Sequence, residues 1–179
     1  MRLFVGVPIP AQAVAAFASV APQLAAVPSA RLVPEGTHHV TLRFMGEVFQ
    51  EQELVAALDG ALRGRPALPC VVEGLGAFPN PKQARILWAG VRAPGIEQLA
   101  AAVEDATQAF GQPPERRRFV AHVTLARLAK SADVRSLLAR HTDTLFGTGN
   151  LDRVVLFDSV TGPAGPRHEV VREWRLGEA

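Results

Sequence analysis

The pattern of apolar and polar positions predicts short strands that alternate with amphipathic helices. Residues 3–7 are wholly apolar, which is typical of a buried strand. Residues 39–44 alternate instead, with His39, Thr41 and Arg43 on one face of a predicted strand and three apolar side chains on the other. The same patterns predict helices over 14–24, 51–62, 96–110 and 131–141, and further strands over 68–76, 85–91, 119–125, 151–160 and 168–176.

The predicted elements describe an internal repeat. The order strand, helix, strand, helix, strand occurs twice, over about 1–83 and 84–166, and an extra strand over 167–176 follows. The copies align without a gap at an offset of 83 residues, which places His-Val-Thr-Leu at 39–42 on the same tetrapeptide at 122–125. Because the chain has only five His, two matching copies are improbable by chance. We therefore expect one α+β domain over 1–179, with two lobes related by a pseudo-two-fold axis around a central cleft. Whether the two halves of the chain interleave is left open.

Composition narrows the class of protein. The chain has 179 residues, 48% of them hydrophobic and 20% charged, which is typical of a globular domain. Its net charge of +2 suits local contact with a phosphate and argues against a broad basic face for duplex DNA. The single cysteine, Cys70, excludes an internal disulfide framework. No apolar run is long enough to span a membrane. We expect a cytoplasmic monomer whose first thirty residues are mature structure.

The repeated His-x-Thr pairs carry the candidate chemistry. Strand geometry places His39 and Thr41 on one face, and His122 and Thr124 on one face of the second strand. Packed about a pseudo-two-fold axis, the two strands bring both imidazoles and both hydroxyls to one groove. One neutral imidazole can accept a proton while an imidazolium donates one, and hydroxyls can bind phosphate oxygens. No Cys, Asp or Glu stands nearby at the right parity for a zinc site, so we expect no metal.

Longer motifs around these pairs make the chain resemble the two-histidine (2H) phosphoesterase superfamily. Within it, the sequence is similar to the RNA 2′,3′-cyclic phosphodiesterases, also called 2′-5′ RNA ligases. The resemblance extends over nearly the whole chain and rests on motifs that occur in order. These are Arg-Leu-Phe-Val at 2–5, His-Val-Thr-Leu-Arg-Phe-Met-Gly at 39–46, Gly-Ala-Phe-Pro at 76–79, Leu-Trp at 87–88, Phe-Val-Ala-His-Val-Thr-Leu-Ala-Arg at 119–127 and Gly-Pro-Ala-Gly-Pro at 162–166.

The resemblance implies a bilobal fold with both signatures lining the cleft, and hydrolysis of a terminal 2′,3′-cyclic phosphate to a 2′-phosphate. It implies that His122 is the general base and His39 the general acid, with Thr41, Thr124 and Arg127 holding the phosphate. Run in reverse, the same reaction would join RNA ends through a 2′-5′ bond without ATP. No cofactor is implied, and the sequence has no P-loop pattern.

Two features depart from this pattern and leave alternatives open. Many members of the family carry an aromatic residue, usually Tyr, after the C-terminal Gly-Pro loop, where this chain has His168. Arg127 lies five residues after His122, so it faces the cleft only if a bulge or the strand's end turns it inward. Arg43, at the right parity, is the alternative phosphate ligand.

The substrate is an RNA end or a small cyclic nucleotide, and the remaining alternative is a catalytically idle module that binds RNA ends.

Overall fold

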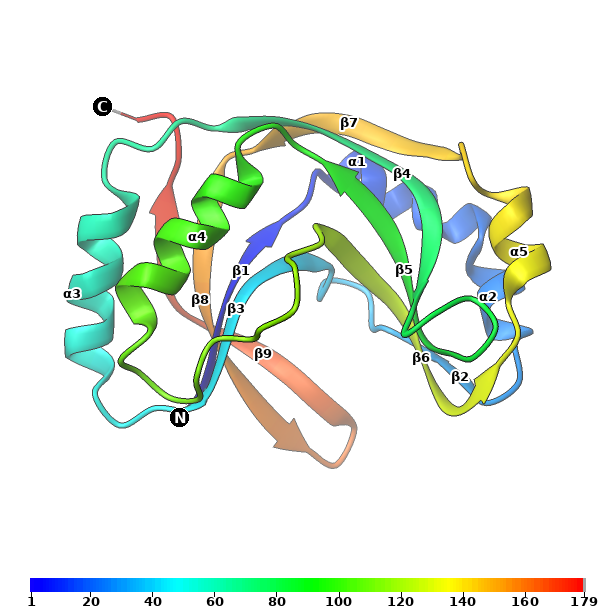
Figure 1. The fold of residues 1–179 in the computed structure, drawn as a ribbon, viewed down its shortest axis with the longest axis horizontal. Helices are drawn as coiled ribbons and strands as arrows, with labels where there is room; N and C mark the ends of the chain where they lie inside the picture. The colour runs from blue at the N-terminus through cyan, green and yellow to red at the C-terminus, as the bar shows by residue number, and fades with distance from the viewer. Residues whose placement is uncertain (179) are drawn as a thin grey trace.

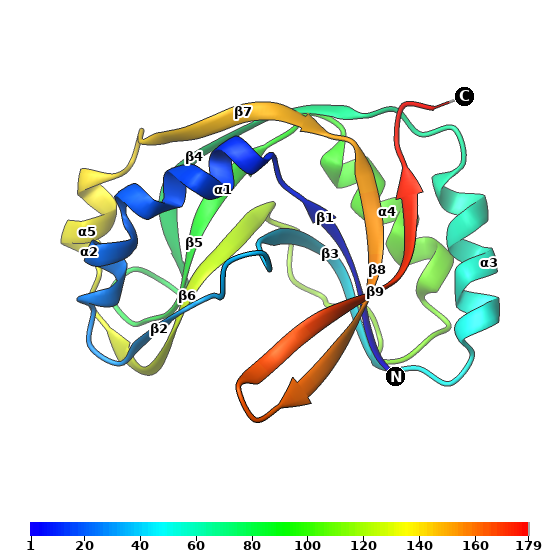
Figure 2. The same cartoon turned by 180° about the vertical axis from the view of Figure 1, so that it is seen from behind.

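The computed structural model describes residues 1–178, which form an α+β fold built on one curled antiparallel sheet (Figures 1 and 2). The strands are β1 (Arg2–Pro8), β2 (Ala30–Leu32), β3 (His39–Glu47), β4 (Leu68–Phe78), β5 (Ala84–Arg92), β6 (His122–Ala132), β7 (Leu145–Leu151), β8 (Arg153–Gly162) and β9 (Gly165–Arg175). The helices are α1 (Ala11–Ala16), η1 (Phe17–Ser19, a 3₁₀ turn), α2 (Ala21–Ala25), α3 (Glu51–Leu62), α4 (Ile96–Thr107) and α5 (Arg135–Arg140).

The sheet has two halves that meet at its centre. The strand order is β7-β4-β5-β6-β3-β1-β8-β9, and β2 pairs with β6. The two central strands, β3 and β6, are joined by a single residue pair, Val40 with Val123. One lobe contains β1, β3, β8 and β9, and the other contains β2 and β4–β7 (Figure 1). Each lobe therefore takes strands from both halves of the sequence, because β8 pairs with β1 and β4 pairs with β5.

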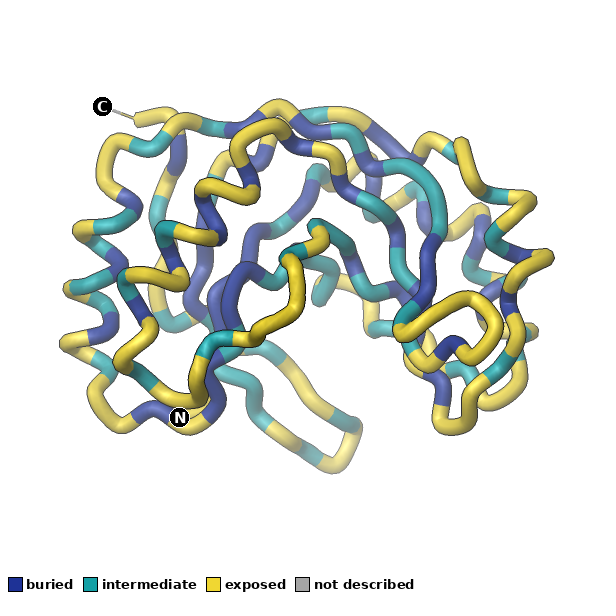
Figure 3. The backbone as a smooth tube through the Cα atoms, viewed as in Figure 1, coloured by how far each residue is buried: buried dark blue, intermediate teal, exposed yellow. Residues whose placement is uncertain are grey.

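The helices cover one face of the sheet in each lobe and leave the other face for the cleft. Helix α3 buries Leu54, Leu58 and Leu62, which recur on one stripe. Helix α4 packs beside α3 and against β3, and it buries Leu99 and Val103. Figure 3 shows buried backbone concentrated in the strands and in the inner faces of these helices. Since the apolar side chains fill this face, the polar face of β3 is turned away from the core.

Three observed elements differ from the expected ones. Strand β7 was not predicted, because its Gly-rich sequence lacks a strand pattern. Its glycines allow close packing: a Cβ on Gly149 would lie 2.7 Å from the Pro10 ring, and one on Gly147 would lie 3.1 Å from the Ala13 nitrogen. The predicted helix over 14–24 is broken into α1, η1 and α2. Pro22 lies in the first turn of α2, a position that favours the start of a new helix. The strand predicted from 119 begins only at His122, and it continues to Ala132.

Candidate active site

The two His-x-Thr pairs lie beside the one residue pair that joins the lobes. Val40 and Val123 are both fully buried, and they pair across β3 and β6. In an antiparallel pair, the residues that flank such a pair also stand opposite each other on the other face. His39 and Thr124 therefore flank Val40–Val123 on one side, and Thr41 and His122 flank it on the other. This face of the sheet, which we call the cleft face, carries two imidazoles and two hydroxyls in a diagonal, pseudo-two-fold arrangement.

Both imidazoles are held by the same backbone contact. Nδ1 of His39 donates to the carbonyl oxygen of Thr37 at 2.7 Å, and Nδ1 of His122 donates to that of Val120 at 2.6 Å. A carbonyl only accepts, so each ring carries its proton on Nδ1 and leaves Nε2 as the reactive nitrogen. Nε2 of His39 lies 3.0 Å from Oγ1 of Thr41. Within residues 1–178, Nε2 of His122 has no such partner and is free to accept a proton.

Aromatic rings fix the orientation of both imidazoles. The ring of His39 lies 5.0 Å from Phe4, 5.6 Å from Phe157 and 5.3 Å from His168, measured between ring centroids. His122 packs edge-on against Phe78 at 5.0 Å. These rings therefore restrict the orientation of each imidazole.

Trp88 completes the packing around His122. Its ring centroid lies 5.8 Å from that of His122, and its paired strand neighbour is Gly76, where any Cβ would collide with the indole. The sequence motifs contain Phe78 and Trp88 but do not show that they pack on a catalytic ring. Phe157 lies outside every motif, and only its register opposite Phe4 brings it to the site.

The surroundings of both histidines favour the neutral form in the free protein. Burial lowers the pKa of His39 to about 4, against an upward effect of its hydrogen bond to Thr37 and with further lowering by His168, His38 and Arg127. Burial also lowers the pKa of His122, and Arg127 adds to this effect. The pKa of His168 is lowered in the same way, by burial and then by Arg127. A bound phosphate anion would act in the opposite direction and favour the imidazolium form.

A β-bulge brings Arg127 to the cleft face. In β6, Thr124 pairs with Trp88 but Ala126 pairs with Leu87, so Leu125 is an extra residue that reverses the strand's alternation. Arg127 consequently pairs with Ile86, two residues from Trp88 and on the same face. The bulge required by the sequence is present, and Arg127 acts electrostatically on His39, His122 and His168.

The same bulge at the equivalent position of β3 turns Arg43 away from the cleft. Thr41 pairs with Gly6 but Arg43 pairs with Val5, so Leu42 is the extra residue. The expectation that Arg43 shares a face with His39 and Thr41 is therefore wrong. Arg43 is only 4% exposed and donates to the carbonyl of Gln112 at 2.7 Å, with longer contacts to Phe110 and Thr107. It holds the segment after α4 onto β3.

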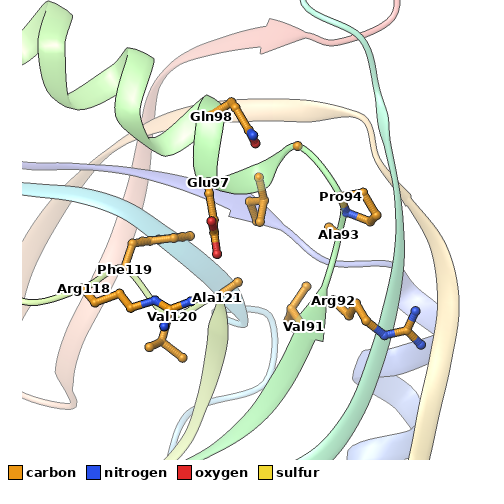
Figure 4. A pocket seen from close by; sticks show the side chains of 12 residues that line it. Val91, Arg92, Ala93, Pro94, Glu97, Gln98, Arg118, Phe119, Val120 and Ala121 are labelled. Carbon is orange, nitrogen blue, oxygen red and sulfur yellow. The ribbon is translucent and has the colours of Figure 1, made fainter.

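Two surface hollows adjoin these strands. One, of about 210 Å³, is lined by His39, Phe157, His168 and Val155, and it continues the cleft over β8 and β9. The other, of about 510 Å³, lies between the N-terminus of α4 and the segment before His122 (Figure 4). Its lining includes Arg92, Glu97 and Arg118 but neither signature histidine. The smaller hollow is therefore the one that belongs to the candidate active site.

The fold and the paired strands define a two-histidine phosphoesterase architecture. The family model of the 2′-5′ RNA ligase superfamily matches residues 9–163, and the chain belongs to that superfamily. The RNA 2′,3′-cyclic phosphodiesterase of Archaeoglobus fulgidus is 30% identical over 176 residues, covering 96% of this chain and 98% of that protein. The enzyme of the same name from Aeropyrum pernix is 31% identical, covering 80% and 84% of the two chains.

Solved structures agree on the fold. The structure of TT0787 from Thermus thermophilus superposes with a TM-score of 0.84 at 27% identity, covering 98% of both chains. Escherichia coli LigT in complex with 3′-AMP gives a TM-score of 0.78 at 23% identity, covering 99% of this chain and 98% of that one. The expected fold class is confirmed.

Residues 1–178 contain no group of three or more His, Cys, Asp or Glu arranged to hold a metal ion. Among the helices in that range, none has the length and apolar character needed to cross a membrane.

Proposed function

We propose that the protein is an RNA 2′,3′-cyclic phosphodiesterase that opens a terminal 2′,3′-cyclic phosphate to a 2′-phosphate. The observation that carries this proposal is the diagonal set of His39, Thr41, His122 and Thr124 around the Val40–Val123 pair. It brings two imidazoles, each held through Nδ1 by a backbone carbonyl, and two hydroxyls to one face of the sheet, which Arg127 shares. The names of the Archaeoglobus and Aeropyrum relatives support the same activity.

The proposed roles follow from the different surroundings of the two imidazoles. Nε2 of His122, which has no partner in residues 1–178, accepts a proton from water as the water oxygen bonds to phosphorus. The bond from phosphorus to O3′ breaks, and His39 gives its Nε2 proton to O3′. The product carries a 2′-phosphate and a 3′-hydroxyl. The same ring opening, with an RNA 5′-hydroxyl in place of water, forms a 2′-5′ bond as the bond from phosphorus to O3′ breaks.

The bound phosphate anion favours the protonated His39 that this mechanism needs, and the proton comes from solvent. In the free protein His39 is neutral near pH 7, since its pKa is about 4. An anionic phosphodiester bound between His39 and Arg127 stabilises the imidazolium and raises the pKa of His39. Once His39 is protonated, its Nε2 donates rather than accepts, which releases the Thr41 hydroxyl to donate to a phosphate oxygen.

Turnover of a defined RNA tests this proposal. A short RNA ending in a 2′,3′-cyclic phosphate is incubated with EDTA and without ATP, and the product is mapped. We expect a 2′-phosphate product from the wild type. We expect no turnover with His39→Ala or His122→Ala, while both variants still bind the RNA.

Other outcomes distinguish the alternatives. Turnover that survives either substitution contradicts the two-histidine mechanism. Binding lost in proportion to activity favours an RNA-end-binding module, and turnover of cyclic mononucleotides alone favours a nucleotide-specific enzyme. The cytoplasmic, monomeric state expected from the sequence is part of this proposal, and size-exclusion chromatography with light scattering tests the monomer.

A further inference from the structure

The bulge in β3 exposes a ring that the proposed reaction does not use. Because Leu42 is an extra residue, Phe44 pairs with Phe4, whose ring lies 5.0 Å from that of His39. Directly paired residues share a face of the sheet, so Phe44 lies on the cleft face. At the offset of 83 residues, Phe44 occupies in β3 the position that Arg127 occupies in β6. The two sides of the cleft therefore carry different groups at equivalent places.

Arg2 adds a cation to this ring. Its guanidinium carbon lies 5.3 Å from the centroid of the Phe44 ring, within the range of a cation–π contact. Arg2 is exposed, and within residues 1–178 its guanidinium forms no hydrogen bond or ion pair. In its counterpart in the repeat, Arg85, the Nε group instead donates a hydrogen bond to the carbonyl of Leu128 at 3.0 Å. The donors of Arg2 thus remain available to a ligand.

The acidic neighbours of Arg2 contact groups other than its guanidinium. Glu47 stands opposite Arg2 in the β1–β3 ladder, and its carboxylate lies 3.8 Å from the N-terminal amino group. The carboxylate of Asp158 accepts the backbone N–H of Arg2 at 3.0 Å. Neither carboxylate forms an ion pair with the guanidinium, so the side chain remains a free cation beside the ring.

Partly exposed rings continue from this pair to the catalytic histidine. Phe44, Phe157 and His168 are all partly exposed, and Phe4 lies buried among them. Phe4 stacks on Phe157 at 5.0 Å and meets His168 edge-on at 4.8 Å. Aromatic surfaces combined with cations bind single-stranded nucleic acids, since every base has a face to stack and every link has a phosphate. Phe44 lies roughly 15 Å along β3 from His39, beyond the reach of a lone terminal nucleotide.

We propose that Arg2 and Phe44 form a second nucleotide subsite, which binds the nucleotide preceding the terminal cyclic phosphate. Phe44 stacks on its base and Arg2 binds its phosphate. This inference rests on the proposed function and makes the substrate a polynucleotide end in preference to a small cyclic nucleotide.

A length series of substrates tests the subsite. The substrates are a nucleoside 2′,3′-cyclic phosphate and RNAs of two, three, four and six nucleotides with the same end. We expect kcat/KM of the wild type to rise with length beyond the mononucleotide. In Phe44→Leu the ratio of kcat/KM for the tetranucleotide to that for the mononucleotide falls about 5-fold or more, the effect of losing one stacked base. Phe44→Trp keeps a ring and retains the rise.

Salt dependence separates the role of Arg2 from that of Phe44. In Arg2→Gln, the slope of log(kcat/KM) against log salt for the tetranucleotide becomes shallower by about 0.7, as one phosphate contact with a single strand is lost. Phe44→Leu leaves this slope at the wild-type value. Phe49→Leu and Arg140→Gln are the matched controls: Phe49 is 86% exposed just after β3, and Arg140 is exposed on α5. Thermal melting of each variant confirms that it folds.

The outcomes separate failure of the subsite from failure of the proposed function. Wild-type kcat/KM that does not change with length, or variants that lose the same factor on every substrate, overturns the subsite and leaves the phosphodiesterase intact. Absence of turnover on every substrate overturns the proposed function. In that event, fluorescence anisotropy with 3′-phosphorylated RNAs of the same lengths tests the subsite, and affinity that Arg2→Gln and Phe44→Leu do not weaken overturns it as well.

Discussion

The two signature histidines are equivalent in sequence and different in their surroundings. Each donates from Nδ1 to the carbonyl two residues before it, at 2.7 Å for His39 and 2.6 Å for His122. Among the contacts of residues 1–178, only those of His39 include a hydroxyl on Nε2 and a second imidazole beside the ring. The base and the acid of the proposed reaction are therefore distinguished by their neighbours, and the repeated tetrapeptide alone assigns neither role.

The pH profile of kcat/KM reports these surroundings in the free protein. The productive form has His39 protonated and His122 neutral, and both pKa values are lowered, that of His39 to about 4. We expect kcat/KM to be constant over a range on the acid side of neutrality. It decreases below about pH 4, and it decreases again above an upper limit that lies below pH 6.5. In kcat the upper limb moves to higher pH, because the bound phosphate raises the pKa of both rings. Steady-state kinetics in constant-ionic-strength buffers measures both profiles, and an upper limb of kcat/KM well above pH 7 contradicts the expectation.

Replacing His168 separates its charge from its packing. Protonated His168 lowers the pKa of His39, and its ring also meets Phe4 edge-on. In His168→Phe the ring remains and the charge is lost, so the pKa of His39 rises. We expect the lower limb of kcat/KM to move to higher pH and the maximum to increase, because more of the free protein carries the required proton on His39. A pH profile that coincides with the wild type shows that His168 has no electrostatic role.

At the scale of elements, two matched bulges decide which side chains reach the cleft. The alternation of residues 39–44 correctly predicts that His39 and Thr41 share a face, and the rule fails at the next residue. Leu42 and Leu125 are each extra residues in their ladders and are both buried. Nothing in an apolar leucine of a strand marks a bulge, because its side chain is buried in either register. The sequence therefore predicted which His and Thr share a face and made a bulge the condition for Arg127 to join them, but it did not predict the matching bulge that turns Arg43 away and brings in Phe44.

Elements that the sequence pattern does not predict depend on long-range packing. Strand β7 exists because it pairs with β4 and lies against α1, contacts made by residues distant in sequence. Helix α3 was predicted at its observed bounds, since its stripe of leucines and its acidic first turn are local signals. Local patterns thus account for the elements that bury one stripe, and not for those that depend on close backbone approach.

Arg127 and Arg43 form a matched pair for testing the bulges. Arg127→Gln removes the cation beside the proposed phosphate, and we expect kcat/KM to fall by about 100-fold, since a charge-assisted hydrogen bond is worth up to about 3 kcal/mol. Its melting temperature should stay near that of the wild type, because Arg127 is exposed. Kinetics and thermal melting of the same preparation measure both effects. Arg127→Gln with wild-type kcat/KM contradicts a phosphate contact.

Arg43→Leu is expected to show the converse behaviour. The substitution removes the donor to the carbonyls of Gln112 and Phe110 and to the hydroxyl of buried Thr107, which costs about 1 to 3 kcal/mol of unfolding free energy. Since Arg43 faces away from the cleft, kcat/KM of the folded fraction should match the wild type. Urea denaturation and active-site-normalised kinetics provide the two measurements. A loss of kcat/KM without a loss of stability would indicate that Arg43 contacts the phosphate.

At the scale of the whole molecule, the candidate active site lies at the junction where the two lobes share the fewest strand contacts. The sheet continues from β6 to β3 through Val40 and Val123 alone, whereas its other neighbouring strands pair over several residues. The cleft histidines flank this narrow junction and are partly buried there. Burial there holds them neutral, so the junction links the proton state of the site to the stability of the fold.

This linkage predicts how stability depends on pH. In the unfolded chain His39 has its ordinary pKa of 6.5, and in the folded protein its pKa is about 4. Between these values the unfolded chain binds more protons than the folded protein. The contribution of neutral His39 to the free energy of unfolding is therefore greatest above pH 6.5 and decreases as the pH drops toward 4. From His39 alone the loss is about 3 kcal/mol.

Comparison with His39→Asn isolates this contribution, because the variant cannot titrate at that position. We expect the difference in unfolding free energy between the wild type and the variant to shrink by about 3 kcal/mol between pH 7 and pH 4. Urea denaturation across this range measures it, and the pH slope is compared instead of the absolute stability, which loss of ring packing also changes. Parallel curves for the two proteins would mean that His39 is as readily protonated in the fold as in water, and the junction would then not hold its catalytic imidazole neutral.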